Sequence, residues 1–450
     1  MFDGKVAPGP ILTSRALPAA QLEVWGGIEC SVVRVRDMLR DQFRETGHHD
    51  RIADLEEVRA LGVRTLRYPV SWERVAPDQP EECGWAWHEE RLAEMRRIGI
   101  KPIVGFVHHG SGPAYTCLSD PRFPEKLAGY AGRVARRFPW VEDWTPVNEP
   151  LTTARFSGLY GHWHPHRSDE ASFIFMVALQ CRAVLLAMRA IREVNPAARL
   201  VQTEDLGRTF ATPELQYQAD YENERRWLSL DLLAGRINPA HGWWGRCLAS
   251  GVPQAWLEDF LAGDLAPMVF GLNYYITSER FLDQRLPFYP GHTHGGNGRH
   301  AYADTEAARV PMPAGLTGWL PRLRDAWHRY PEVPLAVTEV HLGCQEREEQ
   351  VRWLNECWQA AETLRAEGAD LRAVTPWALF GAVDWCSLLT QRRGRYEAGA
   401  FDTSGGSPRR TLLAEGVQAL ATRGTIEHRA LRTPGWWRRD TRFHSALRTM

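Results

Sequence analysis

Short apolar runs alternate with amphipathic stretches along most of the chain. The apolar runs are mostly bounded by Gly, Pro or charged residues, and several are rich in Val, Ile or aromatic residues, which is typical of buried strands. The pattern predicts eight strands, at Glu23–Cys30, Thr65–Trp72, Pro102–His108, Asp143–Asn148, Leu200–Glu204, Met268–Ile276, Leu335–Val340 and Ala373–Phe380.

Helical patterns lie between these strands. Their limits carry recognisable signals, such as Pro124 in a first helical turn and Gly62, Gly99 and Pro139 just beyond helix ends. The predicted helices are Arg51–Leu61, His88–Ile98, Pro124–Phe138, Ala171–Val194, Glu222–Leu233, Pro253–Leu261, Leu316–Tyr330, Glu346–Glu367 and Thr411–Thr422.

Eight strands that alternate with helices indicate a parallel sheet, and eight is the number that closes a barrel. We therefore predict an α/β protein, a single-domain (β/α)8 TIM barrel with long loops over residues 1–425. A doubly wound open sheet is the alternative, but no Gly-x-Gly-x-x-Gly motif follows the first strand. The Gly-, Pro- and His-rich segment Leu286–Met312 predicts a long loop, either a flexible lid or a disordered excursion.

A basic tail with two adjacent tryptophans follows the barrel, at residues 426–450. We expect it to pack on the barrel or to extend from it toward a partner domain or protein.

Composition narrows the class of protein. Hydrophobic residues make up 44% and charged residues 24%, and the net charge is −1, so neither a nucleic acid nor a membrane is expected as a partner. We expect no transmembrane helix and no signal peptide. The eight cysteines form no Cys-x-x-Cys pair and favour buried thiols in the cytoplasm. Packing explains most of the 19 tryptophans, but some suit a carbohydrate site.

Polar and aromatic residues recur at the predicted carboxyl ends of the strands. In a barrel these ends meet on one face, where the chemistry is found, so the set predicts an active site more readily than a series of helix caps. The residues are Glu29, Arg67, His108, His109, Asn148, Glu149, Glu204, Asp205, Asn273, Tyr275, Glu339, Trp377, Asp384 and Trp385.

Two of these residues are Glu149, directly after the fourth strand, and Glu339, on the seventh strand. These two strands face each other across a closed barrel. Two facing carboxyl groups suit glycoside hydrolysis, because one protonates the leaving oxygen while the other attacks the anomeric carbon or activates water. A separation near ~5 Å would give direct attack and retention of configuration.

Six motifs in the same order resemble glycoside hydrolase family 1, the β-glucosidase-like barrel enzymes. Asn148-Glu149-Pro150 is similar to the acid/base motif, and Val337-Thr338-Glu339 to the nucleophile motif. The remaining matches are Arg67-Tyr-Pro-Val-Ser-Trp72, Gly99–Val104 leading to His108, Gly271-Leu-Asn-Tyr-Tyr275, and Trp377 with Asp384-Trp385. The resemblance covers roughly residues 20–420.

The resemblance implies a retaining β-glycosidase without a cofactor or a metal, acting on a carbohydrate. Glu339 would be the nucleophile and Glu149 the acid and then the base. Arg67 and Tyr275 would donate to Glu339, and Asn148 would bind the sugar 2-hydroxyl. The other sugar contacts would come from Glu29, His108, His109, Asn273, Trp377, Asp384, Trp385 and Glu204.

Several departures from the family pattern fall on the pocket for the non-reducing sugar, the glycone. Glu29 stands where Gln is usual, Asp384 where Glu is usual, and His109 where an aromatic residue is usual, while Val340-His341 replace Asn-Gly. Glu204 and Asp205 add further acids. We therefore expect a glycone other than plain glucose, for example an amino sugar.

Two other hypotheses stay open. The altered glycone positions and the Trp-rich tail are also consistent with a sugar-binding or partner-docking barrel whose catalysis is lost or redirected. His162, His164 and His166 alternate in one loop, but their spacing matches no familiar zinc motif, so we expect loop residues on the side of the leaving group, the aglycone.

Overall fold

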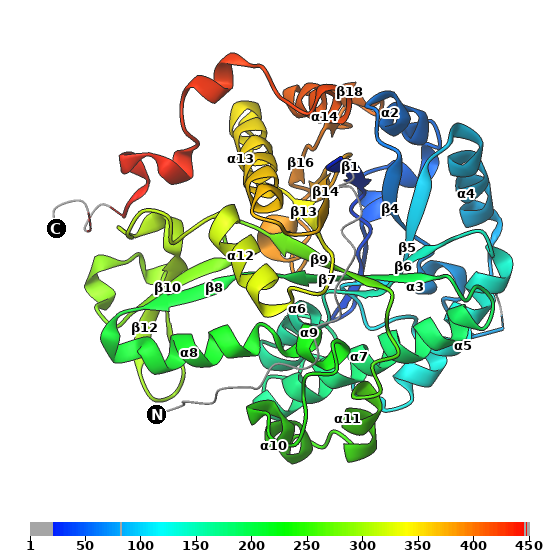
Figure 1. Ribbon diagram of the computed structural model, residues 1–450, viewed down its shortest axis with the longest axis horizontal. Coiled ribbons are helices and arrows are strands. Elements are labelled where there is room, and N and C mark those ends of the chain that lie inside the picture. Colours follow the sequence, from blue (N-terminus) through cyan, green and yellow to red (C-terminus); the bar gives the residue numbers. More distant parts are fainter. Residues whose placement is uncertain (1–20, 82, 445–446, 448–450) are drawn as a thin grey trace.

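Eight parallel strands close into a barrel in the computed structural model, which describes residues 21–81, 83–444 and 447 (Figure 1). The strands are neighbours in chain order, and β1 closes the ring by pairing with both β14 and β4. The predicted (β/α)8 fold is therefore confirmed. The barrel strands are β1 (Glu23–Gly27), β4 (Thr65–Pro69), β5 (Lys101–His108), β6 (Asp143–Asn148), β7 (Arg199–Asp205), β9 (Met268–Tyr274), β13 (Leu335–Val340) and β14 (Leu371–Pro376).

Helices surround the barrel where the amphipathic patterns predict them. Local signals set their limits: the Asp169 side chain accepts a hydrogen bond from Ser172 N at the start of one helix, and another ends at Gly99 in the left-handed conformation. The main helices are α2 (Asp54–Ala60), α4 (Ala86–Ile98), α5 (Phe123–Arg137), α7 (Glu170–Arg192), α8 (Gln216–Arg225), α9 (Leu228–Leu233), α11 (Gln254–Phe260), α12 (Trp319–Arg329), α13 (Arg347–Ala366) and α14 (Leu412–Arg423).

Two helical predictions need correction. The single helix expected at Glu222–Leu233 is divided into α8 and α9 by a turn at Arg226–Trp227, and α10 (Gly242–Ala249) was not predicted. Among the described residues, α7 alone is long and apolar enough to cross a membrane, but 72% of its apolar stretch is buried within the protein. It packs against α5 as a core helix.

The loop predicted at Leu286–Met312 contains ordered strands. β11 (His294–Gly296) and β12 (Ala301–Glu306) join β10 (Glu279–Asp283) and β8 (Arg208–Ala211) in a four-stranded sheet beside the barrel. The prediction of an irregular lid was wrong because these strands are short and carry charges or glycines rather than an apolar run. The small sheet extends the wall around the carboxyl ends of β7 and β9.

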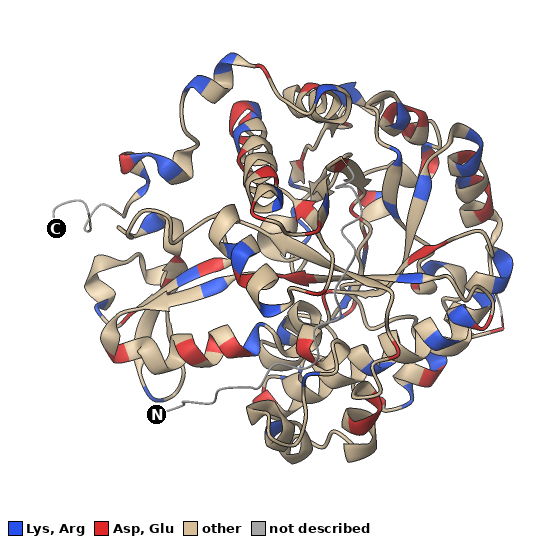
Figure 2. Cartoon of the chain, viewed as in Figure 1, with Lys and Arg blue, Asp and Glu red and all other residues tan. Residues whose placement is uncertain are grey.

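The tail packs on the barrel over its described part. Figure 1 shows this segment running from α14 across α13 toward β10 and β12. Arg352 Nε donates to Ala430 O at 2.8 Å, Trp437 Nε1 donates to Glu356 at 2.7 Å, and Trp436 N donates to Glu349 at 3.0 Å. These three α13 residues share one face of the helix, and Figure 2 shows basic tail residues beside the acidic residues of α13.

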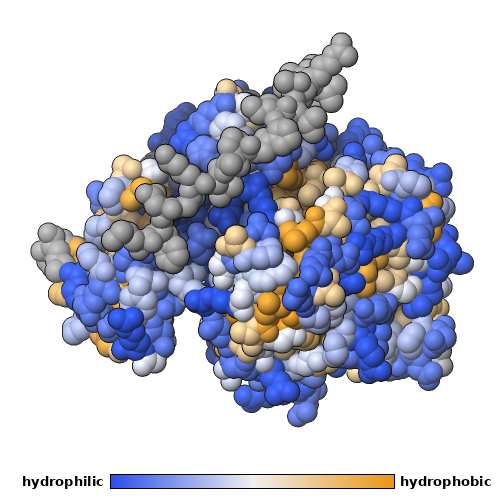
Figure 3. Space-filling model, turned by 60° about the horizontal axis from the view of Figure 1, so that its bottom comes forward, coloured by the Kyte–Doolittle hydropathy of each residue, from blue (hydrophilic) through white to orange (hydrophobic). Residues whose placement is uncertain are grey.

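A layer of apolar side chains fills the inside of the barrel below the functional end. It consists of Trp25, Ile103, Val201, Val269, Ala336 and Ala373, one from each of six strands. This layer makes the barrel a packed core with a single open face. The molecular face in Figure 3 is mainly hydrophilic with apolar residues interspersed.

Candidate active site

A cavity of about 760 Å³ opens at the carboxyl ends of the barrel strands. It lies where a barrel places its chemistry, and its walls come from residues on both sides of the ring. Eight of the strand-end residues singled out in the sequence line it: Glu29, His109, Glu149, Asp205, Tyr275, Glu339, Trp377 and Trp385.

Glu339 lies on β13 and is 1% exposed. Arg67 Nη1 donates to its Oε1 at 2.9 Å, and the Tyr275 hydroxyl donates to its other oxygen. Burial raises the pKa of Glu339, while Arg67 and Tyr275 act in the opposite direction because they stabilise the carboxylate. These two donors hold the carboxylate in one fixed orientation.

Glu149 follows β6 and begins the short helix α6 (Pro150–Ala154) with φ at 44°, an uncommon conformation for a residue with a side chain. Its Oε1 accepts from Asn273 Nδ2 at 2.6 Å, and the nearest cation-forming group is His109 Nε2 at 3.6 Å. Burial, followed by the nearby charge of Glu339, raises the pKa of Glu149 well above its ordinary value. Glu149 is thereby favoured as a protonated acid.

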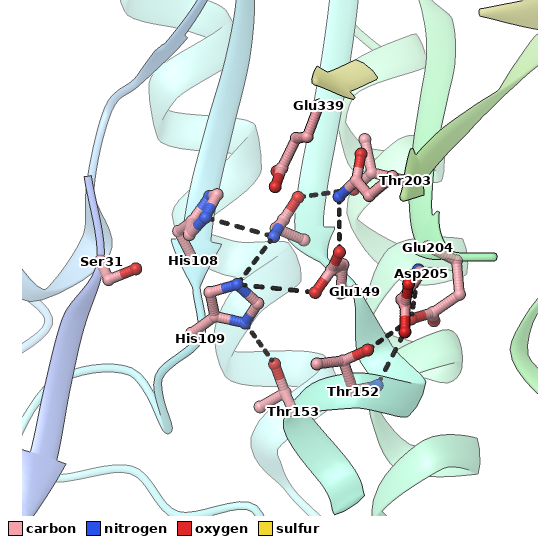
Figure 4. Close-up of polar contacts among 12 residues, drawn as sticks. Ser31, His108, His109, Glu149, Thr152, Thr153, Thr203, Glu204, Asp205 and Glu339 are labelled. Atoms are coloured by element: carbon pink, nitrogen blue, oxygen red, sulfur yellow. Dashed lines mark hydrogen bonds and ion pairs between the residues drawn. The ribbon is translucent and has the colours of Figure 1, made fainter. Parts of the chain in front are cut away.

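A hydrogen-bond network joins the surroundings of the two carboxyl groups. Arg67 Nη2 and Thr203 Oγ1 both donate to Asn148 Oδ1 at 2.7 Å. The Asn148 amide nitrogen in turn lies 3.3 Å from His108 Nε2 and 3.4 Å from His109 Nε2. Figure 4 shows Glu149 and Glu339 in the same part of the site, with His108 and His109 on the side of β5. Arg67 thus positions Asn148 as well as Glu339.

The two histidines are neutral at ordinary pH. Burial lowers the pKa of His109 to about 3, with a further contribution from Arg67, and lowers the pKa of His108 well below its usual range. A neutral imidazole can accept a hydrogen bond as well as donate one, which suits contact with a sugar hydroxyl.

Trp377 forms a wall of the cavity between charged and aromatic neighbours. His108 stacks on it with ring centroids 5.2 Å apart, and the Arg67 guanidinium lies 4.5 Å from its centroid. Its Nε1 donates to Glu29 at 3.2 Å. Trp385 lies beside His109 at 5.4 Å, and its buried Nε1 has no hydrogen-bond partner among the described residues.

Glu29 follows β1 and is 2% exposed. Its Oε1 accepts from Ser31 N at 2.9 Å and from Ser31 Oγ at 2.6 Å. Burial raises the pKa of Glu29, so its neutral form is more favoured than it would be for an exposed Glu.

Asn273 and Glu204 do not line the cavity but form hydrogen bonds to residues around it. Asn273 donates to Glu149 and accepts from Thr338 Oγ1 at 2.7 Å, so both ends of its amide are used. Glu204 is turned toward the start of α6, where it accepts from Leu151 N at 2.9 Å and Ser229 Oγ at 2.7 Å (Figure 4). The sugar contacts that the sequence suggested for these two residues stay predictions.

Asp384, another predicted sugar contact, has protein groups as its hydrogen-bond partners. It is fully buried and accepts hydrogen bonds from the backbone N–H groups of Arg393, Gly394 and Arg395 at 2.8–3.0 Å. Arg40 Nη2 donates to it as well, at 3.1 Å. Burial opposes ionisation, but these donors together lower the pKa of Asp384. Its carboxylate therefore organises the loop after β14 and does not line the cavity.

The cavity wall also contains residues that the sequence did not indicate, among them Arg155 and Trp436. Arg155, on a π-helical turn at Arg155–Leu159, lies 3.6 Å from Asp205, and Trp436 of the tail also lines the wall. π-Helical turns are frequent at functional sites, but their hydrogen bonding leaves no distinctive pattern in the sequence.

The alternating histidines of the loop at 161–166 do not converge on one point. His166 Nδ1 lies 2.9 Å from Gly161 O, and its Nε2 accepts from Arg36 N at 3.0 Å, so both ring nitrogens serve the loop. Across the described ranges, no three His, Cys, Asp or Glu side chains are grouped as metal ligands.

Comparisons with known proteins agree on one family. The sequence model described as "Glycosyl hydrolase family 1" matches residues 45–398, more than half of the chain. The bifunctional β-D-glucosidase/β-D-fucosidase of Bifidobacterium breve is 26% identical over 79% of this chain and 86% of its own length. Beta-glucosidase 47 of Arabidopsis thaliana is 23% identical over 88% of this chain and 79% of its own.

Among solved structures, the family 1 β-glucosidase of Thermotoga maritima matches with a TM-score of 0.70 and 16% identity, over 90% of this chain and 98% of that one. At this identity the match concerns the fold, and the family assignment depends on the sequence comparison. The chain, with its closed barrel and its two buried glutamates in one cavity, belongs to glycosyl hydrolase family 1.

Proposed function

We propose that the protein is a retaining β-glycosidase in which Glu339 is the nucleophile and Glu149 is the acid/base. The observation that carries this proposal is the contrast between the two carboxyl groups of one cavity. Glu339 has a guanidinium and a phenol as donors, whereas Glu149 has an amide and lies in surroundings that favour its proton. Two carboxyl groups with different environments are what acid and nucleophile roles require.

In the first step Glu339 attacks the anomeric carbon, the bond to the leaving oxygen breaks, and Glu149 gives its proton to that oxygen. The covalent glycosyl-enzyme then holds Glu339 as an ester, while Glu149 is ionised. In the second step Glu149 takes a proton from water, or from another alcohol in a transfer reaction, whose oxygen displaces Glu339. Asn148, held by Arg67 and Thr203, would bind the sugar 2-hydroxyl.

The glycone is proposed to differ from plain glucose, since Glu29 and Asp384 replace the Gln and Glu that are usual in the family. Fewer acids are available to a glycone than the sequence suggests, because the carboxyl groups of Glu204 and Asp384 accept hydrogen bonds from backbone N–H groups. Of the added acids, Glu29 and Asp205 line the cavity, so an amino-sugar glycone would depend on these two residues. The names of the relatives add β-glucosides, β-fucosides and aryl-phospho-β-glucosides to the candidates.

The test is hydrolysis of a panel of 4-nitrophenyl β-glycosides that contains glucose, fucose, glucosamine and 6-phosphoglucose as glycones. We expect turnover on at least one, with a loss of several orders of magnitude in Glu339→Ala and Glu149→Ala. Tighter binding of the glucosaminide than the glucoside, abolished in Glu29→Gln, would support the amino sugar. Equal binding of the two would exclude it.

The alternative is a sugar-binding barrel without turnover, which would show saturable binding of a glycone and no hydrolysis on any panel member. The intact pair of Glu149 and Glu339, with donors arranged around both, favours the enzyme because binding alone does not need an acid and a nucleophile. A cytoplasmic location remains a proposal, and it is consistent with eight free cysteines.

A further inference from the structure

The C-terminal tail forms part of the catalytic cavity wall. Trp436 lines the same cavity as Glu149 and Glu339, although it lies far along the chain from both. Trp436 begins a short 3-10 helix that packs on the turn Ala307–Arg309 after β12. The tail is therefore a structural element of the cavity and not a loose extension.

Several contacts hold this part of the tail in place. His444 N donates to Arg309 O at 3.2 Å, and Thr305 Oγ1 lies 2.9 Å from His444 Nε2. On the α13 side, the neighbouring Trp437 is 3% exposed and packs on Trp353 with ring centroids 4.9 Å apart. Because Trp437 is the buried anchor, half-buried Trp436 is left free to face the cavity.

Trp436 and Arg309 form a stacked pair in the wall. The Arg309 guanidinium carbon lies 4.2 Å from the Trp436 ring centroid. The one hydrogen bond that the Arg309 side chain makes to a described residue runs from Nη1 to Arg442 O at 3.4 Å, and no described carboxylate lies within ion-pair distance of it. A stacked guanidinium keeps its edge free to donate two parallel hydrogen bonds to a carboxylate.

The rest of this end of the cavity is rich in arginine. Six arginines line it (Arg155, Arg208, Arg225, Arg226, Arg280 and Arg309), against four carboxylates (Asp205, Glu222, Asp304 and Glu306). Arg208 and Arg226 are paired with Asp325, and Arg280 with Asp304. Arg309 has no such partner, so a ligand with a negative charge is favoured at its position.

We propose that Trp436 and Arg309 form a distal aglycone subsite for a leaving group that carries a flat ring and a carboxylate. The ring would stack on the part of the Trp436 indole that lines the cavity, and the carboxylate would pair with Arg309. This inference rests on the proposed glycosidase function, because it assigns the aglycone end of that same cavity.

A matched pair of fluorogenic substrates tests the subsite: the 4-methylumbelliferyl and the 7-hydroxycoumarin-4-acetic acid β-glycosides of the glycone that the panel identifies. They share the coumarin ring and differ in the carboxylate. We expect the wild type to favour the acid, Trp436→Ala to raise KM for both about tenfold, and Arg309→Gln to remove the preference for the acid. The 4-nitrophenyl glycoside, whose aglycone is shorter, should be unaffected by both variants.

Two controls separate a local effect from a general one. Trp256→Ala removes another half-buried tryptophan, on α11 and outside the cavity, and Arg438→Gln removes a tail arginine that pairs with Glu356 instead. Neither should change the substrate preference. An unchanged KM for coumarin glycosides in Trp436→Ala, or a retained preference for the acid in Arg309→Gln, would overturn the subsite while leaving the glycosidase assignment intact.

If no glycoside is turned over, the proposed function fails and the subsite is tested by equilibrium binding of free 7-hydroxycoumarin-4-acetic acid. Saturable binding that is lost in Arg309→Gln and retained in Arg438→Gln would support it. Equal binding by the wild type and Arg309→Gln, or none by either, would refute it.

Discussion

The residues around Glu149 control when it holds its proton. Besides burial and the charge of Glu339, the charges of Asp205 and Glu204 raise the pKa of Glu149. Arg155 lies 3.6 Å from Asp205, and His109 lies 3.6 Å from Glu149. In the proposed mechanism Glu339 must be ionised and Glu149 protonated for the first step, so Glu339 would set the acid limb of the pH profile of kcat/KM and Glu149 the alkaline limb.

Asp205→Asn is expected to move the alkaline limb to lower pH. The variant removes a negative charge and leaves Arg155 without its partner, and both changes lower the pKa of Glu149. The measurement is kcat/KM against pH, with Asp220→Asn, an exposed residue of α8, as the control. An alkaline limb that stays in place, or moves to higher pH, would contradict this description of Glu149.

Gly27 on β1 lets Trp377 approach the strand. A Cβ at this position would lie 2.2 Å from Trp377 Cε3, which is too close for any side chain. We predict that Gly27→Ala displaces the indole from Arg67 and Glu29 and lowers kcat/KM by about tenfold or more. Gly129→Ala on α5, where a Cβ meets nothing within 4 Å, is the control and should leave activity unchanged. Wild-type kcat/KM in Gly27→Ala would show that Trp377 does not form the glycone wall.

At the level of elements, the loop after β14 depends on Asp384. Because its carboxylate receives three backbone N–H groups and Arg40 in a buried place, Asp384→Asn should lower the free energy of unfolding by about 3 kcal/mol. Urea unfolding measures this, with the exposed Asp37→Asn expected to change stability by less than about 0.5 kcal/mol. If Asp384→Asn keeps full stability but loses sugar affinity, Asp384 is a sugar contact after all.

The elements that the sequence predicts well are those with a strong local signal. All eight barrel strands were predicted because most are apolar runs between Gly, Pro or charged residues, and Asn148, Glu149 and Glu339 were singled out by their places at strand ends. The small sheet was missed because β10 is charged at three of its five positions, β12 contains Asp304 and Glu306, and β11 is His-Gly-Gly, so none of them is an apolar run. The hydrogen bonds of Asp384 could not be predicted because three of them come from backbone groups, whose direction depends on the loop conformation and not on residue type.

At the scale of the whole molecule, the barrel brings together groups that are distant in the chain. Arg67 from β4 reaches both Glu339 on β13 and Asn148 on β6, and the tail adds Trp436 to the wall beyond them. The closed ring fixes the relation of the two glutamates, while residues of the small sheet and of the tail form the outer wall of the cavity. In the proposed function, the ring would supply the chemistry, and the small sheet and the tail would supply contacts to the aglycone.

The central claim is that Glu339 becomes covalently bound to the sugar. The direct measurement is mass spectrometry of the protein after incubation with a 2-deoxy-2-fluoro β-glycoside of an active leaving group, followed by peptide mapping. We predict one added fluoroglycosyl group, located on Glu339, and absent in Glu339→Ala. An adduct on another residue, or hydrolysis with inversion and no adduct, would contradict the account.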